Sequence, residues 1–283
     1  MTEKDNMPAQ AGANKPKTLQ GLMNSPAMVR KLNGILGNEK TAKAFISSVI
    51  SVGNGNPALR LADPMSVIGA AMVAATLNLP IVPTLGMAYI VPYKGQAQFQ
   101  IGYKGLIELA QRSGEFRTII DEVVYEGELI SKNRFTGEFV FDETTRLSDK
   151  VIGYMARYDL INGFSKTIYW TREEVEAHAR QYSQSFRGQF QSPWKTNFDQ
   201  MARKTVLKSL FSKYAPKSTE INMAVEADQA TVRLKKPIEE IEDVTIDSFV
   251  MEYDDNPEAH AETVAEDVDP SKDLFGERKG KGK

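Results

Sequence analysis

The chain has 283 residues, 41% of them hydrophobic and 25% charged, which is typical of a globular protein with a core for one or two domains. It contains no cysteine, which excludes disulfides, thiolate catalysis and cysteine-ligated metal sites. The net charge of −2 hides an asymmetry, because residues 166–217 hold ten basic and four acidic residues, whereas residues 231–283 hold eight basic and fifteen acidic residues.

The two ends of the chain differ in composition from its middle. Residues 1–17 are polar and lack the apolar stretch of a signal peptide, and the longest apolar run, 67–79, is too short to span a bilayer. We expect a disordered segment over 1–17, a single domain over 18–230 and a flexible acidic tail over 231–283 that binds a partner. We expect a cytoplasmic protein with no membrane contact.

The first third of the chain predicts helices followed by a hairpin. Ser25-Pro26 is a typical helix start, because proline lacks the N–H that would be unpaired there. The expected helices are 26–36, 39–52, 64–77 and 103–113, with a β-hairpin formed by 87–91 and 97–101. The helix at 64–77 is apolar on nearly every face, so we expect it to be buried.

Alternating apolar residues dominate the middle of the chain and predict strands at 117–126, 128–134, 138–142, 150–159 and 164–170. Thr171 and Glu174 form a capping-box pattern that opens a helix to about residue 182. Ser192-Pro193 opens a further helix to residue 214, and a short helix is expected within 218–230. The predicted fold class is α+β, with a small antiparallel sheet and hairpins packed against several helices.

The segment 180–217 alternates basic and aromatic side chains and contains a single acid, Asp199. Cations spaced along a path can follow a phosphate backbone, and exposed rings can stack on bases. An ordinary solvated face and core-packed rings are the alternative interpretation. The stretch therefore predicts a single-stranded nucleic-acid surface, which would take in Lys94, Lys104 and Arg112 as well.

The helix expected at 193–214 has an apolar arc with one basic residue inside it. Arg203 lies within that arc, so it either pairs with a core carboxylate or lines a groove beside phosphate, and the sequence leaves both open. Lys204 and Lys208 lie one turn apart on the opposite side, which indicates either phosphate contacts or a solvated face. Trp194, in the first turn, is either a packing anchor or a ring that stacks on bases.

Catalytic residues are hard to assemble from this sequence. It has two histidines, His178 and His260, and neither belongs to a recognisable catalytic set. The carboxylates between Asp121 and Glu128 could suggest a two-metal nuclease, but residues alternate between faces on a strand, so we interpret them as solvated charges. We expect no enzymatic activity, no cofactor and no metal.

Several motifs together resemble the phage RecT/Redβ family of single-strand annealing proteins. They are the run SPWKTNFDQMARKTVLKSLFSKYAPKS at 192–218, IGYKGLIELAQRSG at 101–114, the hairpin at 85–100, TREEVEAHA at 171–179 and the acidic tail. The resemblance implies an ATP-independent recombinase that binds single-stranded DNA, anneals complementary strands and holds the duplex in an oligomeric ring or filament. A passive single-strand coat without annealing activity is the alternative.

The resemblance also implies partners and a site. The partners would be single-stranded and annealed duplex DNA, further copies of the chain, a phage exonuclease and the host single-strand-binding protein, in the cytoplasm of a bacterial cell. The helical block 25–77 would supply contacts between subunits. The DNA-binding residues carried over are Lys94, Lys104, Arg112, Arg180, Phe186, Arg187, Gln189, Trp194, Lys195, Asn197, Phe198, Arg203, Lys204 and Lys208.

Overall fold

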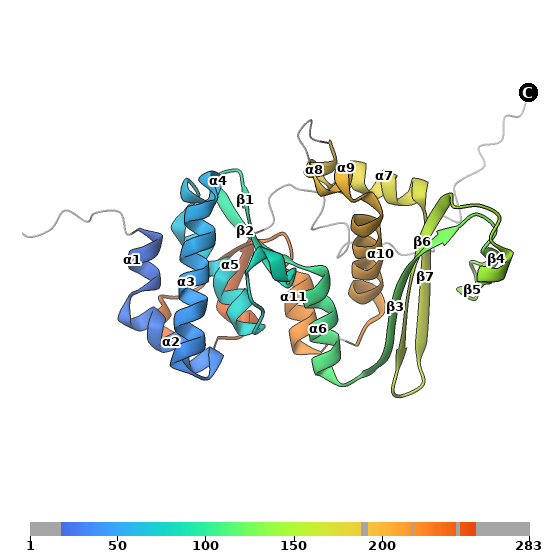
Figure 1. Cartoon of the computed structure of the whole chain (residues 1–283). Coiled ribbons are helices and arrows are strands. Elements are labelled where there is room, and N and C mark those ends of the chain that lie inside the picture. Colours follow the sequence, from blue (N-terminus) through green and yellow to red (C-terminus); the bar gives the residue numbers. More distant parts are fainter. Residues whose placement is uncertain (1–17, 188–191, 217, 242–243, 253–283) are drawn as a thin grey trace, which may run out of the picture.

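A computed structural model describes residues 18–187, 192–216, 218–241 and 244–252 as two lobes side by side (Figure 1). The first lobe contains α1 (Leu19–Met23), α2 (Pro26–Leu36), α3 (Glu39–Gly55), α4 (Pro57–Arg60), α5 (Pro64–Thr76), β1 (Ala88–Tyr93), β2 (Gln96–Ile101), α6 (Tyr103–Ser113), α11 (Thr219–Ala227), β8 (Thr231–Leu234) and β9 (Phe249–Glu252). The second contains β3 (Phe116–Tyr125), β4 (Leu129–Asn133), β5 (Glu138–Phe141), β6 (Val151–Leu160), β7 (Ser165–Thr171), α7 (Arg172–Tyr182), α8 (Gln184–Arg187), α9 (Pro193–Thr196) and α10 (Phe198–Tyr214).

The first lobe is built around α5, which is buried almost all round, as its sequence predicts. It packs against β2 and β8 of an antiparallel sheet with the strand order β1-β2-β8-β9. Gly69 of α5 lies so close to the carbonyl group of Val232 in β8 that any side chain at position 69 would clash with it. Glycine is therefore required for α5 to approach this sheet.

The buried position of β8 corrects the expected start of the acidic tail at residue 231. Val232 is fully buried, and β8 pairs with both β2 and β9. The domain therefore continues past residue 230 and reaches at least Glu252, the end of β9. The two strands could not be recognised in the acidic sequence 231–283, because their few apolar residues are outnumbered by the charged residues around them.

The second lobe packs α7 and α10 against a sheet with the order β3-β6-β7. Tyr154, Ala156 and Tyr158 alternate along β6 and are fully buried. The hydroxyl group of Tyr158 donates a hydrogen bond to the carbonyl of Tyr214 at the end of α10. One edge of the sheet is β7, and the separate β4–β5 hairpin projects beyond it at the end of the lobe (Figure 1).

The α+β class with small antiparallel sheets is confirmed, and the expected elements lie within a few residues of their predicted positions. Two helices differ. Helix α3 continues to Gly55, past its predicted end at residue 52. The helix expected over 193–214 is interrupted at Asn197, whose φ of −141° and ψ of 55° are not helical, and this separates α9 from α10. Within the described ranges, no helix combines the length and apolarity needed to cross a membrane.

Candidate nucleic-acid interface

Arg203 on α10 forms an ion pair with a core carboxylate. Its Nε lies 2.7 Å from Oδ2 of Asp121, and its Nη2 donates to the backbone oxygen of Asp121, also at 2.7 Å. Asp121 is only 6% exposed, and its other carboxylate oxygen accepts a hydrogen bond from the hydroxyl group of Tyr103. Burial and this hydrogen bond raise the pKa of Tyr103 to about 12. Of the two roles that the sequence left open, the ion pair with a core carboxylate is confirmed.

The prediction that the carboxylates between Asp121 and Glu128 are all solvated is wrong for Asp121, which is buried. Burying a carboxylate is tolerated here because Arg203 neutralises it. Among the residues that the structure describes, no three histidine or acidic side chains are grouped so that they could hold a metal ion.

Lys208, one turn after Lys204, connects the two lobes. Its Nζ lies 2.7 Å from Oδ2 of Asp228, and the two side chains are 14% and 1% exposed. The other oxygen of Asp228 accepts a hydrogen bond from the backbone N–H of Ile101 at 2.9 Å. The alternative of a solvated face is therefore wrong for Lys208, because the first lobe covers it.

Lys204 lies in the same place with a different electrostatic balance. It is half-buried and forms no hydrogen bond or ion pair with any residue that the structure describes. Burial lowers its pKa, the positive charge of Lys208 lowers it further, and Asp228 has the opposite effect. Asp228 pairs with Lys208, whereas Lys204 has no carboxylate partner among the described residues. We name this group the lobe junction (Lys204, Lys208 and Asp228).

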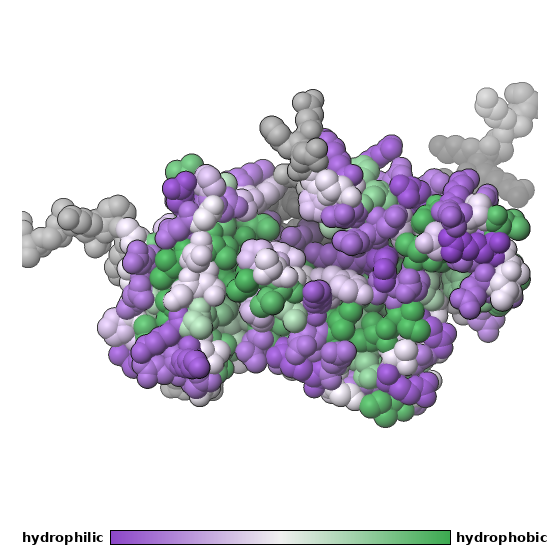
Figure 2. Space-filling view, in the orientation of Figure 1, coloured by the Kyte–Doolittle hydropathy of each residue, from purple (hydrophilic) through white to green (hydrophobic). Residues whose placement is uncertain are grey.

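Hydrophilic side chains occupy much of the surface between the two lobes (Figure 2). His178 of α7 lies between the lobe junction and β7, the edge strand of the second lobe's sheet. Its ring centroid lies 5.1 Å from that of Trp170 and 4.6 Å from that of Tyr182. Burial, with a contribution from Lys208, lowers the pKa of His178 to about 4. The imidazole is therefore neutral near pH 7.

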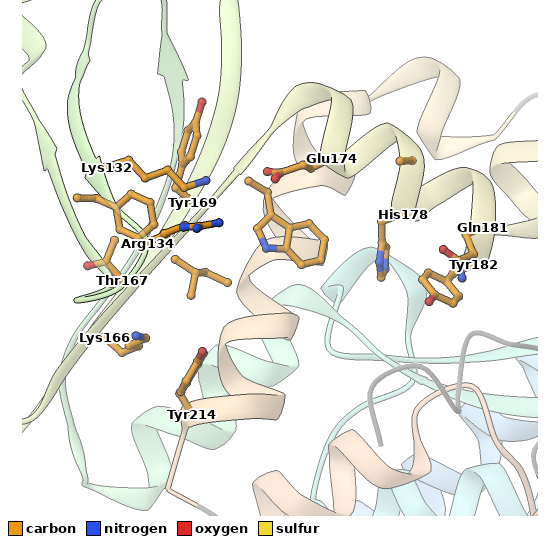
Figure 3. A pocket seen from close by; sticks show the side chains of 15 residues that line it. Lys132, Arg134, Lys166, Thr167, Tyr169, Glu174, His178, Gln181, Tyr182 and Tyr214 are labelled. Atoms are coloured by element: carbon orange, nitrogen blue, oxygen red, sulfur yellow. The ribbon is translucent and has the colours of Figure 1, made fainter. Parts of the chain in front are cut away.

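A cavity of about 550 Å³ lies beyond His178, between the free edge of β7, one flank of α7, the end of α10 and the β4–β5 hairpin (Figure 3). We name it the β7 pocket. Lys132, Arg134 and Lys166 supply positive charge, and Glu174 is the acidic residue among those that line it. Its aromatic lining comprises Phe139, Tyr169, Trp170, Tyr182 and Tyr214. Figure 3 shows the basic side chains on the strand side, facing Glu174, His178 and Tyr182 from α7.

The cations of the β7 pocket lie beside its aromatic rings. Nζ of Lys166 is 4.7 Å from the ring centroid of Tyr214, and Nζ of Lys132 is 5.9 Å from that of Phe139 and 5.8 Å from that of Tyr169. Neither lysine forms an ion pair with a carboxylate in the described part of the chain. Cation–π contacts hold such groups without neutralising them, so their charge stays available to an anion.

Trp194 was a predicted DNA contact, and the structure supports the other interpretation, a packing anchor. It is 6% exposed. The ring of Phe186 meets it edge-on at 5.5 Å between centroids, and that of Phe198 lies 5.6 Å away. The guanidinium carbon of Arg172 lies 4.4 Å from the Phe198 centroid. We name these four residues the Trp194 cluster.

The other predicted contacts are spread over the surface. Those classed as exposed are Lys94, Lys104, Arg112, Arg180, Arg187, Lys195 and Asn197. Arg180 lies 3.7 Å from Glu176, and Arg187 donates to the backbone oxygen of Gln181 at 3.2 Å. Arg112 donates to the backbone oxygen of Leu77 at 2.5 Å, so it helps to end α5. Gln189 lies outside the described residues.

The β7 pocket could hardly be predicted from the sequence. Lys132 and Arg134 lie on a short hairpin, and Lys166 is more than thirty residues further along the chain. The available signal was the pairing of β6 with β7, which the Asn162-Gly163 turn predicts, because it makes Lys166 a residue of a strand that ends at α7. Nothing local to the hairpin showed that it would lie beside that strand.

The RecT family model matches residues 43–246, which include the whole second lobe and most of the first. The chain belongs to the RecT family. It is 46% identical over 230 residues to the uncharacterized protein YqaK of Bacillus subtilis strain 168, covering 81% of this chain and 78% of YqaK. It is 31% identical over 231 residues to protein RecT of Escherichia coli K12, covering 77% of this chain and 82% of that protein.

Membership of the RecT family supports a part in DNA recombination by single-strand annealing. The matched region includes β8, one of the two strands that corrected the domain boundary, and ends three residues before β9 begins. The lobe junction and the β7 pocket both lie within it.

Proposed function

We propose that this RecT-family chain binds single-stranded DNA along the β7 pocket and the lobe junction, and anneals complementary strands without ATP. The observation that carries the proposal is a cavity of about 550 Å³ in which Lys132, Arg134 and Lys166 accompany several aromatic rings. The cations would hold phosphates, and the rings would pack against bases or sugars. Lys204 would continue the path of positive charge at the junction.

Annealing makes few chemical demands on the protein. Base pairing between the two strands supplies the driving free energy, and no covalent bond of the DNA changes. The protein has to neutralise phosphate repulsion and leave base edges free, so contacts to the backbone suffice. The β7 pocket suits this role because its cations form no ion pair with any residue that the structure describes. The activity is therefore non-enzymatic.

Assembly into a ring or filament would join many weak sites on one strand. Large apolar side chains are exposed at both ends of the molecule: Leu61 (86%) and Met65 (45%) in the first lobe, and Phe135 (86%) and Leu147 (79%) in the second. Two different apolar surfaces on one chain suit a head-to-tail contact, which repeats from copy to copy. The first surface lies in the helical block expected to form subunit contacts.

We assign the other exposed residues predicted to contact DNA to positions outside the β7 pocket and the lobe junction. Lys94, Lys104, Lys195 and Asn197 would reach DNA that leaves the groove, since all four are exposed. The proposed partners are a phage exonuclease that produces the single strand and the host single-strand-binding protein, in the cytoplasm of a bacterium.

The test is the rate at which two complementary oligonucleotides pair, followed by fluorescence quenching without nucleotide or metal. The full chain should speed pairing, whereas a passive coat would slow it. A variant with Lys132, Arg134 and Lys166 all changed to alanine should lose most of the acceleration. The matched control changes the exposed Lys40, Lys43 and Lys235. Equal rates for the two variants would reject the β7 pocket as the site.

A further inference from the structure

An acidic segment follows the last described strand. Residues 253–273 contain eight acidic residues and one basic residue. Its starting point is set by β9, because Glu252 is the register partner of Thr231, the first residue of β8. Thr231 follows Asp228 by three residues, and Asp228 holds Lys208. The acidic segment therefore starts beside the lobe junction.

The acidic segment is long enough to reach both the lobe junction and the β7 pocket. Its twenty-one residues span at most ~70 Å when extended, against a diameter of ~30 Å for a small domain. A tethered segment acts at an effective concentration in the millimolar range, so even weak attraction gives substantial occupancy. Reach and tethering thus allow contact with both the junction and the β7 pocket.

The charges of the groove and the segment are complementary. Lys204 has no hydrogen-bonding or ion-pairing partner among the described residues, and neither Lys132 nor Lys166 has a carboxylate partner there. A half-buried ammonium group without a counterion is unfavourable, as the lowered pKa of Lys204 indicates. A polyanion that enters relieves this cost, and the eight carboxylates of residues 253–273 form a polyanion that is covalently attached at Glu252.

We propose that residues 253–273 occupy the lobe junction and the β7 pocket when no DNA is bound, and that DNA displaces them. The part that concerns DNA depends on the proposed function, whereas the docking of the segment does not. The acidic segment would weaken the binding of short single strands more than the binding of long strands, because short strands displace it poorly. It would also help to release DNA from the groove.

Zero-length carbodiimide cross-linking of the full chain without DNA tests the docking. Peptide mass spectrometry should find residues 253–273 joined to Lys204, Lys166 or Lys132. A control chain has amides in place of the segment's acids, and these links should vanish from it. Links confined to remote lysines such as Lys40 and Lys43 would overturn the proposal. The acids to be changed are Asp254, Asp255, Glu258, Glu262, Glu266, Asp267, Asp269 and Asp273.

The same amide variant tests the competition. At low salt it should bind a short single-stranded oligonucleotide roughly 5- to 20-fold more tightly than the unmodified chain, and the two should converge near 0.5 M salt, where charges are screened. Equal affinities at low salt would overturn the competition. If neither chain binds DNA while the groove cross-links persist, the proposed function fails and the docking stands.

Discussion

The Trp194 cluster and the β7 pocket contain the same kinds of side chain and differ in their neighbours. In the cluster, Arg172 lies 3.4 Å from Glu176 and 3.5 Å from Asp199, and Trp194 is buried. In the β7 pocket, Lys132 and Lys166 have no carboxylate partner in the described chain, and the rings line an open cavity. Composition alone makes both candidates for DNA binding. Charge compensation separates a packed cluster from an accessible site.

Helix α10 repeats the contrast over adjacent residues. Arg203 pairs with the buried carboxylate of Asp121, whereas Asp228 pairs with Lys208 and Lys204 has no carboxylate partner among the described residues. A compensated cation fixes the fold, and an excess cation attracts a ligand. Four predictions break or sharpen this distinction.

The largest effect is expected from Arg203→Ala. It leaves the carboxylate of Asp121 buried without its cation, which should lower the free energy of unfolding by about 3 kcal/mol. Urea denaturation measures the loss. The control Arg180→Ala removes an exposed pair and should change stability little. Adding Asp121→Asn to Arg203→Ala should restore part of the loss, and failure to do so would show that the ion pair is not its cause.

Changing Lys132, Arg134 and Lys166 together to alanine should weaken single-stranded DNA binding by roughly 10- to 100-fold near 0.15 M salt. The slope of log K against log salt should become shallower by about 2, since each phosphate contact on a single strand contributes about 0.7. The melting temperature should stay nearly constant, because these side chains form no ion pairs within the described part of the chain. An unchanged salt slope would place the DNA elsewhere.

His178 lines the β7 pocket close to Lys208 of the lobe junction, and its titration can be followed through the free energy of unfolding. Its folded pKa of about 4 lies below the ordinary value of 6.5, so the unfolded chain takes up the proton more readily. Its contribution is complete above pH 6.5 and is lost as the pH falls toward 4. Between pH 7 and pH 5 the unmodified chain should lose about 2 kcal/mol more than His178→Gln. Parallel pH profiles would contradict a neutral, half-buried imidazole.

The smallest effect is expected from Lys204→Gln. It should reduce the salt slope by about 0.7 and leave stability unchanged or slightly improved, because it removes an uncompensated charge. Lys208→Gln should give a similar slope change but also destabilise the chain, since it leaves Asp228 without its cation. Equal stability of the two variants would contradict the distinction between Lys208, which pairs with Asp228, and Lys204, which does not.

Much of the fold could be predicted from short-range patterns. The capping residues Ser25 and Thr171, the Asn162-Gly163 turn and the alternation along β6 each depend on residues within a few positions of one another. The boundary at residue 231 was wrong because β8 and β9 are four residues long each, too short to show a period among charged neighbours. The break at Asn197 was missed because the sequence around it shows no proline or glycine to end a helix.

The sequence by itself determined the α+β class, most helices and strands, the basic segment and the resemblance to the RecT family. Tertiary structure alone decided which cations are free. Asp121 pairs with Arg203 across 82 positions, and the β4–β5 hairpin comes to lie beside β7, which completes the pocket. The physical reason is that periodicity and capping act within a few residues, whereas the compensation of a charge depends on which distant segments the folded chain brings within a few ångströms.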